Sequence, residues 1–308
     1  LIFLIILSQP SVILAQLIPK SNFINQTKKI CYDAGIEWES LTFFSPIRFH
    51  SKLQSEQSNF LSSTQINSQI GLTARNDSYS LHGFGRIRYK NNYYAYTYPI
   101  FVKKYVPNQY LKQKTKFVNQ YESSSGLGFE NSWAIMQICR GNESWAAGND
   151  IELALSHDSG TYDYLLLGSD YGKLRVRYIH GFLEKVEPNI NRYITARGLE
   201  WTNKKSFIIG FSETIIYSGE NRSLDIGYLN PMSSHLEVEL NNRLNVVGNQ
   251  NSNAVWQIHI DYYFNNKVRI SGNYLYDEFV LDRDIEINKE HGKAFSIRLA
   301  YTPILTNK

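Results

Sequence analysis

The residue pair that could carry out catalysis is His259 and Asp261, which are two positions apart. This spacing puts both side chains on one face of a β-strand, as a barrel lipase with a Ser-His-Asp set would require. The sequence singles out no serine partner, and it contains no G-x-S-x-G elbow, H-E-x-x-H motif or glycine-rich phosphate loop. We therefore expect no enzymatic activity, with an outer-membrane phospholipase-type barrel as the less favoured alternative.

The cysteines and histidines do not form a metal-binding motif. Only Cys31 and Cys139 are present, and neither lies in a cluster with the seven scattered histidines. We therefore predict no metal site and no cofactor. A disulfide between the two cysteines and a pair of free thiols both stay open, because the sequence does not fix the distance between them.

Arginines on polar strand faces are better candidates for binding than for catalysis. A guanidinium group binds carboxylates in a bidentate way, which suits an acidic polysaccharide, whereas an ion-pair network that stiffens a barrel lumen would use the same residues. The residues that could serve either role are Arg175, Arg177, Arg197, Glu200, Glu213, Arg269, His259 and Asp261, with Arg86 and Arg88 as further polar-face arginines.

Three of these candidates raise a question of strand phase. Arg197 and Glu200 are three positions apart and fall on opposite strand faces unless Gly198 makes a bulge. Glu213 has the same phase as the apolar Phe211. We expect a bulge or an inward turn at Glu213, because an ionised side chain that faces lipid is costly.

The elements that would position these residues are long alternating strands. In residues 255–263 one face carries Trp256, Ile258, Ile260 and Tyr262, and the other carries Gln257, His259 and Asp261. The same two-residue period recurs in residues 173–182, 267–276 and 294–302, with about a dozen strand candidates between residues 80 and 302.

Two architectures fit such alternation. A soluble β-sandwich buries the apolar face, whereas a membrane β-barrel turns it toward lipid. Runs of about 9–11 residues are long enough to cross a bilayer and favour the barrel. Aromatic residues near strand ends, of the kind that form interface girdles, also favour it: Tyr89, Tyr93, Tyr94, Tyr96 and Tyr98, and again Tyr262, Tyr263 and Phe264.

Composition and the first residues indicate an exported protein without a nucleic-acid partner. The net charge is only +4 among 308 residues. Residues 1–15, LIFLIILSQPSVILA, resemble the apolar core of a secretory signal that is too short to span a membrane comfortably. Because no methionine or basic leader precedes it, we expect the sequence to start inside that signal.

Four motifs follow one another in the second half of the chain: RYIHGFLE at 177–184, RYITARGLEW at 192–201, FIIGFSETIIYSG at 207–219 and GYLNPM at 227–232, preceded by a polar loop GNESWAAGND at 141–150. In this order they resemble the Wzi family of capsule-assembly outer-membrane proteins, in its Bacteroidetes-like form. The resemblance implies a non-enzymatic outer-membrane barrel that helps capsular polysaccharide attach or assemble at the surface, in some relatives with adhesion or gliding. Family members are generally longer, which suggests either a fragment or a barrel with fewer strands.

The sequence thus predicts an all-β protein of the bacterial outer membrane. We expect a truncated signal peptide at 1–15, a short irregular or helical N-terminal periplasmic or early barrel segment at 16–79, and an antiparallel β-barrel at 80–308. The expected partners are capsular or surface polysaccharide and outer-membrane lipid, the expected state is a monomer, and the alternative is a secreted β-sandwich that binds glycans.

Overall fold

The computed structural model describes residues 64–75, 78–90, 92–106, 116–147, 152–156, 159–186, 189–235, 237, 251–264, 267–277 and 292–301. The predicted signal at 1–15, Cys31 and most of the predicted 16–79 segment therefore lie outside the described residues.

Twelve strands make up almost all of the described secondary structure, beside the four-residue helix α3 (Ile226–Leu229). They range from 8 residues in β5 to 15 in β4, so nearly all reach the length that a tilted membrane strand needs. The strands are β1 (Thr64–Arg75), β2 (Ser78–Tyr89), β3 (Tyr93–Val106), β4 (Lys116–Glu130), β5 (Ala134–Gly141), β6 (Tyr162–Asp170), β7 (Leu174–Val186), β8 (Ile190–Thr202), β9 (Phe207–Glu220), β10 (Asn251–Phe264), β11 (Val268–Asp277) and β12 (Gly292–Tyr301).

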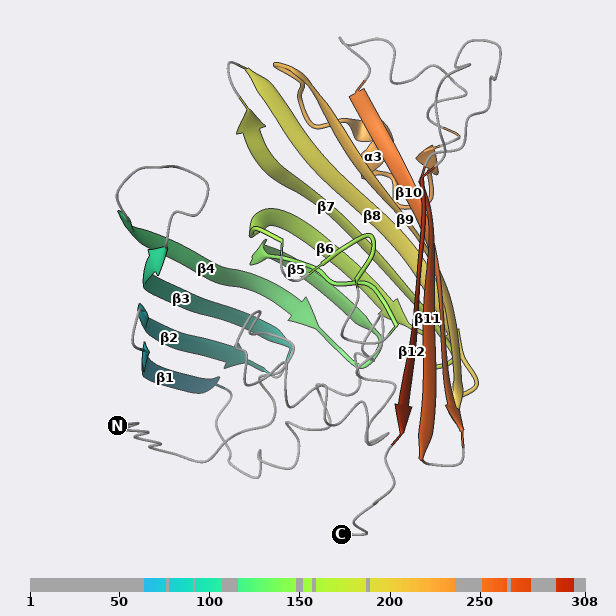
Figure 1. Ribbon diagram of the computed structural model, residues 1–308, viewed down its shortest axis with the longest axis horizontal. Helices are drawn as coiled ribbons and strands as arrows, with labels where there is room; N and C mark the ends of the chain where they lie inside the picture. The colour runs from blue at the N-terminus through green and yellow to red at the C-terminus, as the bar shows by residue number, and fades with distance from the viewer. Residues whose placement is uncertain are drawn as a thin grey trace.

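The strands form one antiparallel sheet in which each strand pairs with its neighbours in sequence, in the order β1 to β12. Figure 1 shows this sheet curving from β1 to β12 like the wall of a barrel, with β1 and β12 at the two ends of the order. The all-β antiparallel fold predicted from the sequence is confirmed. Its first strand begins at Thr64, inside the segment 16–79 that was assigned to the periplasm or to the early barrel.

The connections differ in length between the two ends of the sheet. At one end they are short, at residues 90–92, 131–133, 171–173, 203–206 and 265–267. The Asn131 side-chain oxygen accepts the backbone N–H groups of Trp133 and Ala134, and Asn203 plays the same role in its turn, which is how asparagine stabilises tight turns. At the other end the connections at 76–77 and 187–189 are also short, but those at 142–161 and 221–250 are far longer.

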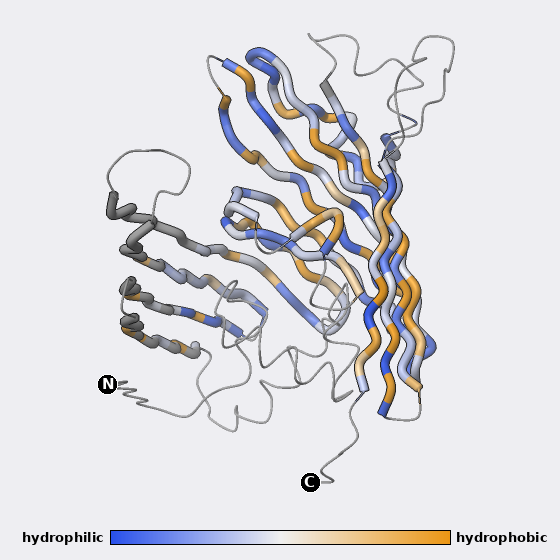
Figure 2. Tube along the Cα trace, in the orientation of Figure 1, coloured by the Kyte–Doolittle hydropathy of each residue, from blue (hydrophilic) through white to orange (hydrophobic). Residues whose placement is uncertain are grey.

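Figure 2 shows hydrophilic and hydrophobic residues alternating along the strands. Because successive side chains point to opposite faces, one face of the sheet is apolar and the other polar. In β10, Ile258 and Ile260 on the convex face are 44% and 41% exposed, whereas His259 and Asp261 on the concave face are fully buried. The apolar side chains of these strands thus lie on the surface and the ionic ones lie inside. A soluble sandwich would have the reverse arrangement, so the structure favours the barrel.

The tyrosines near the turn between β2 and β3 divide between the two faces. Tyr89 and Tyr93 are exposed on the convex side, as an interface girdle requires, but Tyr94, Tyr96 and Tyr98 are buried on the concave side. The prediction that the whole cluster belongs to a girdle is wrong for these last three. Strand alternation forces neighbouring tyrosines onto opposite faces.

Candidate functional site

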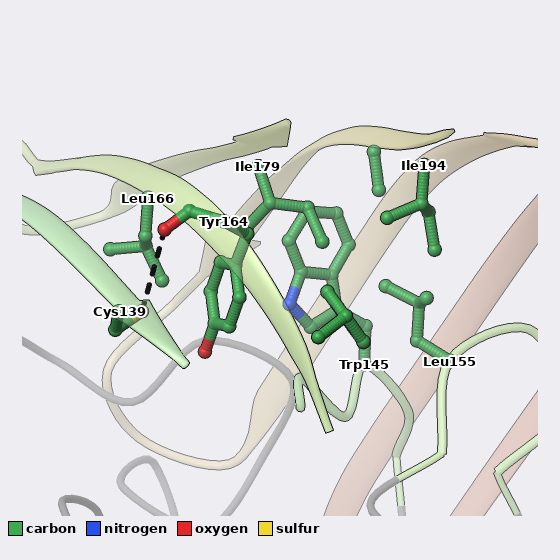
Figure 3. Close-up of a cluster of buried hydrophobic side chains, with 9 residues drawn as sticks. Cys139, Trp145, Leu155, Tyr164, Leu166, Ile179 and Ile194 are labelled. Carbon is green, nitrogen blue, oxygen red and sulfur yellow. Dashed lines mark hydrogen bonds between the residues drawn. The ribbon is translucent and has the colours of Figure 1, made fainter. Parts of the chain in front are cut away.

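The connection between β5 and β6, residues 142–161, is called here the inner loop, and its described parts pack against the concave face of the sheet. Its Trp145 is fully buried, and with Leu155 it joins Ile179 of β7 and Ile194 of β8 in an apolar cluster. Figure 3 shows Trp145 and Leu155 lying against these strand residues. The inner loop and the strands therefore share an apolar cluster inside the curve of the sheet.

Two side-chain amides from distant strands hold the inner loop in place. Gln257 of β10 donates to the Trp145 carbonyl oxygen at 2.7 Å and accepts from the Ala154 N–H at 3.2 Å. Asn273 of β11 accepts from the Ala147 N–H at 2.8 Å and donates to its carbonyl oxygen at 2.7 Å. The inner loop therefore contacts β6 and β7 on one side of the barrel wall and β10 and β11 on the other. Because all these contacts are on the concave face, the loop occupies part of the space inside the curve of the sheet.

Glu143 connects the inner loop to the charged residues of the wall. Its carboxylate accepts hydrogen bonds from the Trp145 indole N–H at 3.0 Å and from the Tyr164 hydroxyl at 2.9 Å. Arg177 Nη1 lies 3.5 Å from the same carboxylate. The predicted candidate Arg177 is therefore an anchor for this loop.

Three of the predicted candidates form one buried network on the concave face. Glu200 of β8 lies between Arg175 of β7, 2.5 Å from its Oε1, and His259 of β10, 3.0 Å from its Oε2. All three side chains are almost completely shielded from solvent. A buried carboxylate that contacts a guanidinium and an imidazole is well compensated, so the network holds three strands together.

The pair formed by Asp261 and Arg269 is a second ion pair on the same face. Arg269 of β11 donates from Nε and Nη2 to the Asp261 carboxylate in a bidentate contact, and both side chains are fully buried. His259 takes its carboxylate contact from Glu200 instead of Asp261. The two residues that could belong to a hydrolase set do share a face, as predicted, but each contacts a different partner.

A further group of side chains combines arginine with aromatic residues. Arg86 and Arg88 of β2 stand directly opposite Tyr96 and Tyr94 of β3 in the register. Gln137 of β5 accepts from the Tyr94 hydroxyl at 2.6 Å and donates to the Tyr96 hydroxyl at 3.0 Å. These residues, called here the arginine–tyrosine cluster, are all buried on the concave face.

The two arginines of this cluster differ in their partners. Arg88 forms an ion pair with Glu130. Arg86 is only 4% exposed, and among the described residues no carboxylate pairs with it, while its Nε and Nη2 atoms make no hydrogen bond. A buried cation without a counterion is costly, so Arg86 is a place where an anion would be stabilised.

Arg197 and Glu213 lie on the opposite face from the other candidates. Arg197 Nε is 3.2 Å from Glu213 Oε2, and no register shift occurs around either residue. The expected bulge or inward turn at Glu213 is therefore wrong. Glu213 points outward and is buried because another part of the chain covers it.

That cover is residues 221–235 of the connection between β9 and β10, called here the outer segment. Tyr228 in α3 stacks on Tyr217 with ring centroids 4.7 Å apart, and its carbonyl oxygen accepts from the Tyr178 hydroxyl at 2.8 Å. The His235 N–H donates to Glu213 at 3.0 Å, and Arg197 donates to the Asn230 carbonyl oxygen at 3.2 Å. The predicted sites thus divide between the inner and outer faces of one sheet.

Alternation shows that the outer segment and the inner loop lie on opposite faces. Ile179 packs in the Trp145 cluster, whereas the adjacent Tyr178 bonds to the outer segment. Neighbouring residues of a strand point to opposite sides. The sequence indicated a polar loop at 141–150 but gave no sign that this loop turns inward. It also gave no sign that Glu143, Gln257 and Asn273 anchor the loop. The partners of the two amides, Gln257 and Asn273, are more than a hundred residues away in the chain.

Comparisons with family models and with curated proteins give no match. Two solved structures are similar. The first, described as NanC porin, shares 9% identity over 78% of this chain and 100% of its own length, with a TM-score of 0.33. The second, described as OmpT, an outer membrane protein of Vibrio cholerae, shares 10% identity over 71% of this chain and 88% of its own, with a TM-score of 0.30. Both likenesses are distant, and neither identifies the function.

The side-chain distribution identifies the kind of protein. Apolar residues line the convex face and buried ion pairs line the concave face, which is the pattern of an outer-membrane β-barrel. This arrangement agrees with the outer-membrane barrel predicted from the sequence. Within the described residues, no helix is long and apolar enough to cross a membrane, and no group of three or more His, Cys, Asp or Glu side chains is placed to hold a metal ion.

Proposed function

We propose that this protein is a non-enzymatic outer-membrane barrel of the Wzi type that binds surface polysaccharide and aids its assembly or attachment. The motifs within residues 141–232 suggest the family. The single observation that carries the binding role is the arginine–tyrosine cluster, where Arg86 is buried without a carboxylate partner among the described residues.

The chemistry of this cluster suits an acidic sugar. Tyrosine rings provide flat apolar faces against which sugar rings can stack, and the rings of Tyr94 and Tyr96 lie nearly parallel, 24° apart. A carboxylate of the sugar would supply a counterion that Arg86 does not find among the described residues, through a charge-assisted hydrogen bond. The cluster therefore favours a carboxylated polysaccharide over a neutral one.

The hydrolase alternative has weaker support. His259 contacts Glu200, which also pairs with Arg175, and Asp261 is held by Arg269. A histidine that acts as a general base must reach a nucleophile, and these contacts instead fit a network that stabilises the wall. We therefore assign no reaction to this protein.

Binding can be tested with the purified protein in detergent, with polygalacturonate as the acidic probe and dextran as the neutral one. The intact protein should bind polygalacturonate in preference to dextran. Arg86→Gln should weaken this binding about tenfold or more, because a charge-assisted hydrogen bond contributes roughly 1.5–3 kcal/mol.

Arg140→Gln is the matched control, because Arg140 forms an exposed ion pair with Asp163 on the outer face. It removes the same charge and should leave binding unchanged. Equal losses for both variants would mean that only net charge matters, and equal binding of the two probes would reject the arginine–tyrosine cluster as an acidic-sugar site. A deletion strain with a normal capsule would reject the proposed role in assembly.

A further inference from the structure

The outward-facing ion pair of Arg197 and Glu213 lies in an unusual place for a membrane barrel. In the register, Arg197 and Glu213 stand between Tyr178 and Trp256, in a row that crosses β7 to β10. The adjacent outward row toward the short-turn end contains Leu199, Phe211 and Ile258, all exposed. The ion pair is thus in direct continuity with the apolar belt.

The height of this row can be estimated from strand geometry. Glu213 is six positions from Phe207, where β9 leaves its short turn, which is about 20 Å along the strand and about 15 Å along the axis of a barrel with strands tilted by about 40°. The apolar band of such barrels is about 25 Å tall. Arg197 and Glu213 therefore fall within the height of that band.

The outer segment covers this row, and its exposed side chains include three large apolar ones beside the polar Ser223 and Asn230. Arg222, Tyr228 and His235 are buried against the sheet, whereas Ile226 and Met232 are 80% and 88% exposed. Leu224 is also exposed. Exposed apolar residues beside a lipid-facing belt extend that belt.

We propose that residues 224–232 of the outer segment lie in the outer leaflet of the membrane and contact lipid acyl chains through Leu224, Ile226 and Met232. It replaces the outward face of β7 to β9 as the lipid-contacting surface and keeps the Arg197–Glu213 pair away from the acyl chains. The long-loop end of the sheet is the extracellular end in barrels of this kind, which places this contact on the outer leaflet. The inference rests on the membrane placement used in the proposed function.

The experiment measures where nitroxide spin labels lie in the full-length chain, reconstituted into phosphatidylcholine and phosphatidylglycerol vesicles. Single cysteines are introduced by Met232→Cys, Ile258→Cys and Asn221→Cys in a Cys31→Ser, Cys139→Ala background, whose folding is checked by heat-modifiable gel migration. Collisions with oxygen report lipid contact, and collisions with a water-soluble nickel chelate report water. The labels at 232 and 258 should both favour oxygen, several-fold more than the label at 221.

The outcomes separate the two claims. This inference is overturned if the label at 258 is in lipid while the label at 232 is as exposed to water as the label at 221. That result would still support the placement of the barrel in the membrane. A wet Ile258 label would reject the membrane placement itself. Dipolar coupling between labels at 232 would mean that a second copy covers the segment, which also overturns the inference.

A second measurement needs no cysteine replacement. Met232→Asp should lower the melting temperature in the same vesicles more than Asn221→Asp does, because only the first places a carboxylate against acyl chains. Equal shifts would contradict lipid contact at Met232.

Discussion

Gly210 of β9 lies directly between His259 of β10 and Glu200 of β8 in the register of the sheet. A Cβ atom at position 210 would overlap the His259 ring. The missing side chain lets the imidazole cross β9 and reach the Glu200 carboxylate, which in turn contacts Arg175. One row of residues therefore links four strands through their side chains as well as through the backbone.

Gly210→Ala should destabilise the barrel, because the added methyl group forces the His259 ring out of its contact with Glu200. Overpacking of this kind costs about 1–3 kcal/mol. The measurement is the unfolding midpoint in urea, read from heat-modifiable migration in detergent. Gly272→Ala is the control, since a Cβ there meets only the Ser296 carbonyl oxygen at an ordinary 3.5 Å. An equal midpoint for the two variants would show that the space above Gly210 is not used by the imidazole.

Glu200→Gln should be more harmful than the same change at an exposed ion pair. It removes the carboxylate charge that Glu200 presents to the buried Arg175, and breaking a buried pair costs about 3–5 kcal/mol. Glu184→Gln breaks the half-exposed contact with Arg192 and should cost about 0–1 kcal/mol. Both free energies of unfolding can be measured by urea titration. A Glu200→Gln barrel as stable as the Glu184→Gln barrel would contradict the network.

Asn273→Ala should release the inner loop, because the backbone N–H and carbonyl groups of Ala147 lose both of their bonds to the side chain. Unsatisfied buried groups cost about 1–3 kcal/mol each, which favours an open loop. Planar bilayer recordings should then show larger or more frequent conductance steps than the unaltered protein shows. Trp133→Ala, at an exposed residue of the turn between β4 and β5, should leave the recordings unchanged. Identical conductance in all three proteins would mean that the inner loop does not obstruct the lumen.

Tyr228→Ala should detach the outer segment without unfolding the sheet. The change removes the stacking on Tyr217 of β9, which holds the segment against the sheet, and the bond to His235, which lies within the segment. Limited proteolysis should cut within residues 221–235 faster, while heat-modifiable migration stays normal. Ser223→Ala, at an exposed position of the same segment, serves as the control. Unchanged proteolysis would indicate that other contacts fix the segment.

Much of the wall could be predicted from alternation alone. Because successive side chains of a strand point to opposite faces, Ile258 and Ile260 had to lie together and His259 and Asp261 had to lie opposite them. The same rule correctly separated Arg197 from Glu200. Neighbouring strands in sequence also pair in space, so the positions of Arg175 and Glu200 on adjacent strands followed from strand order.

The sequence by itself determined most of the strands and their two faces, because these properties depend on local geometry with a period of two. Only the tertiary structure decided what covers each face. The inward position of the described parts of the inner loop, the outward turn of residues 221–235 and the burial of Glu213 all depend on contacts between segments far apart in the chain. No periodic pattern encodes such contacts, because a connection can fold toward either side of the sheet that it leaves.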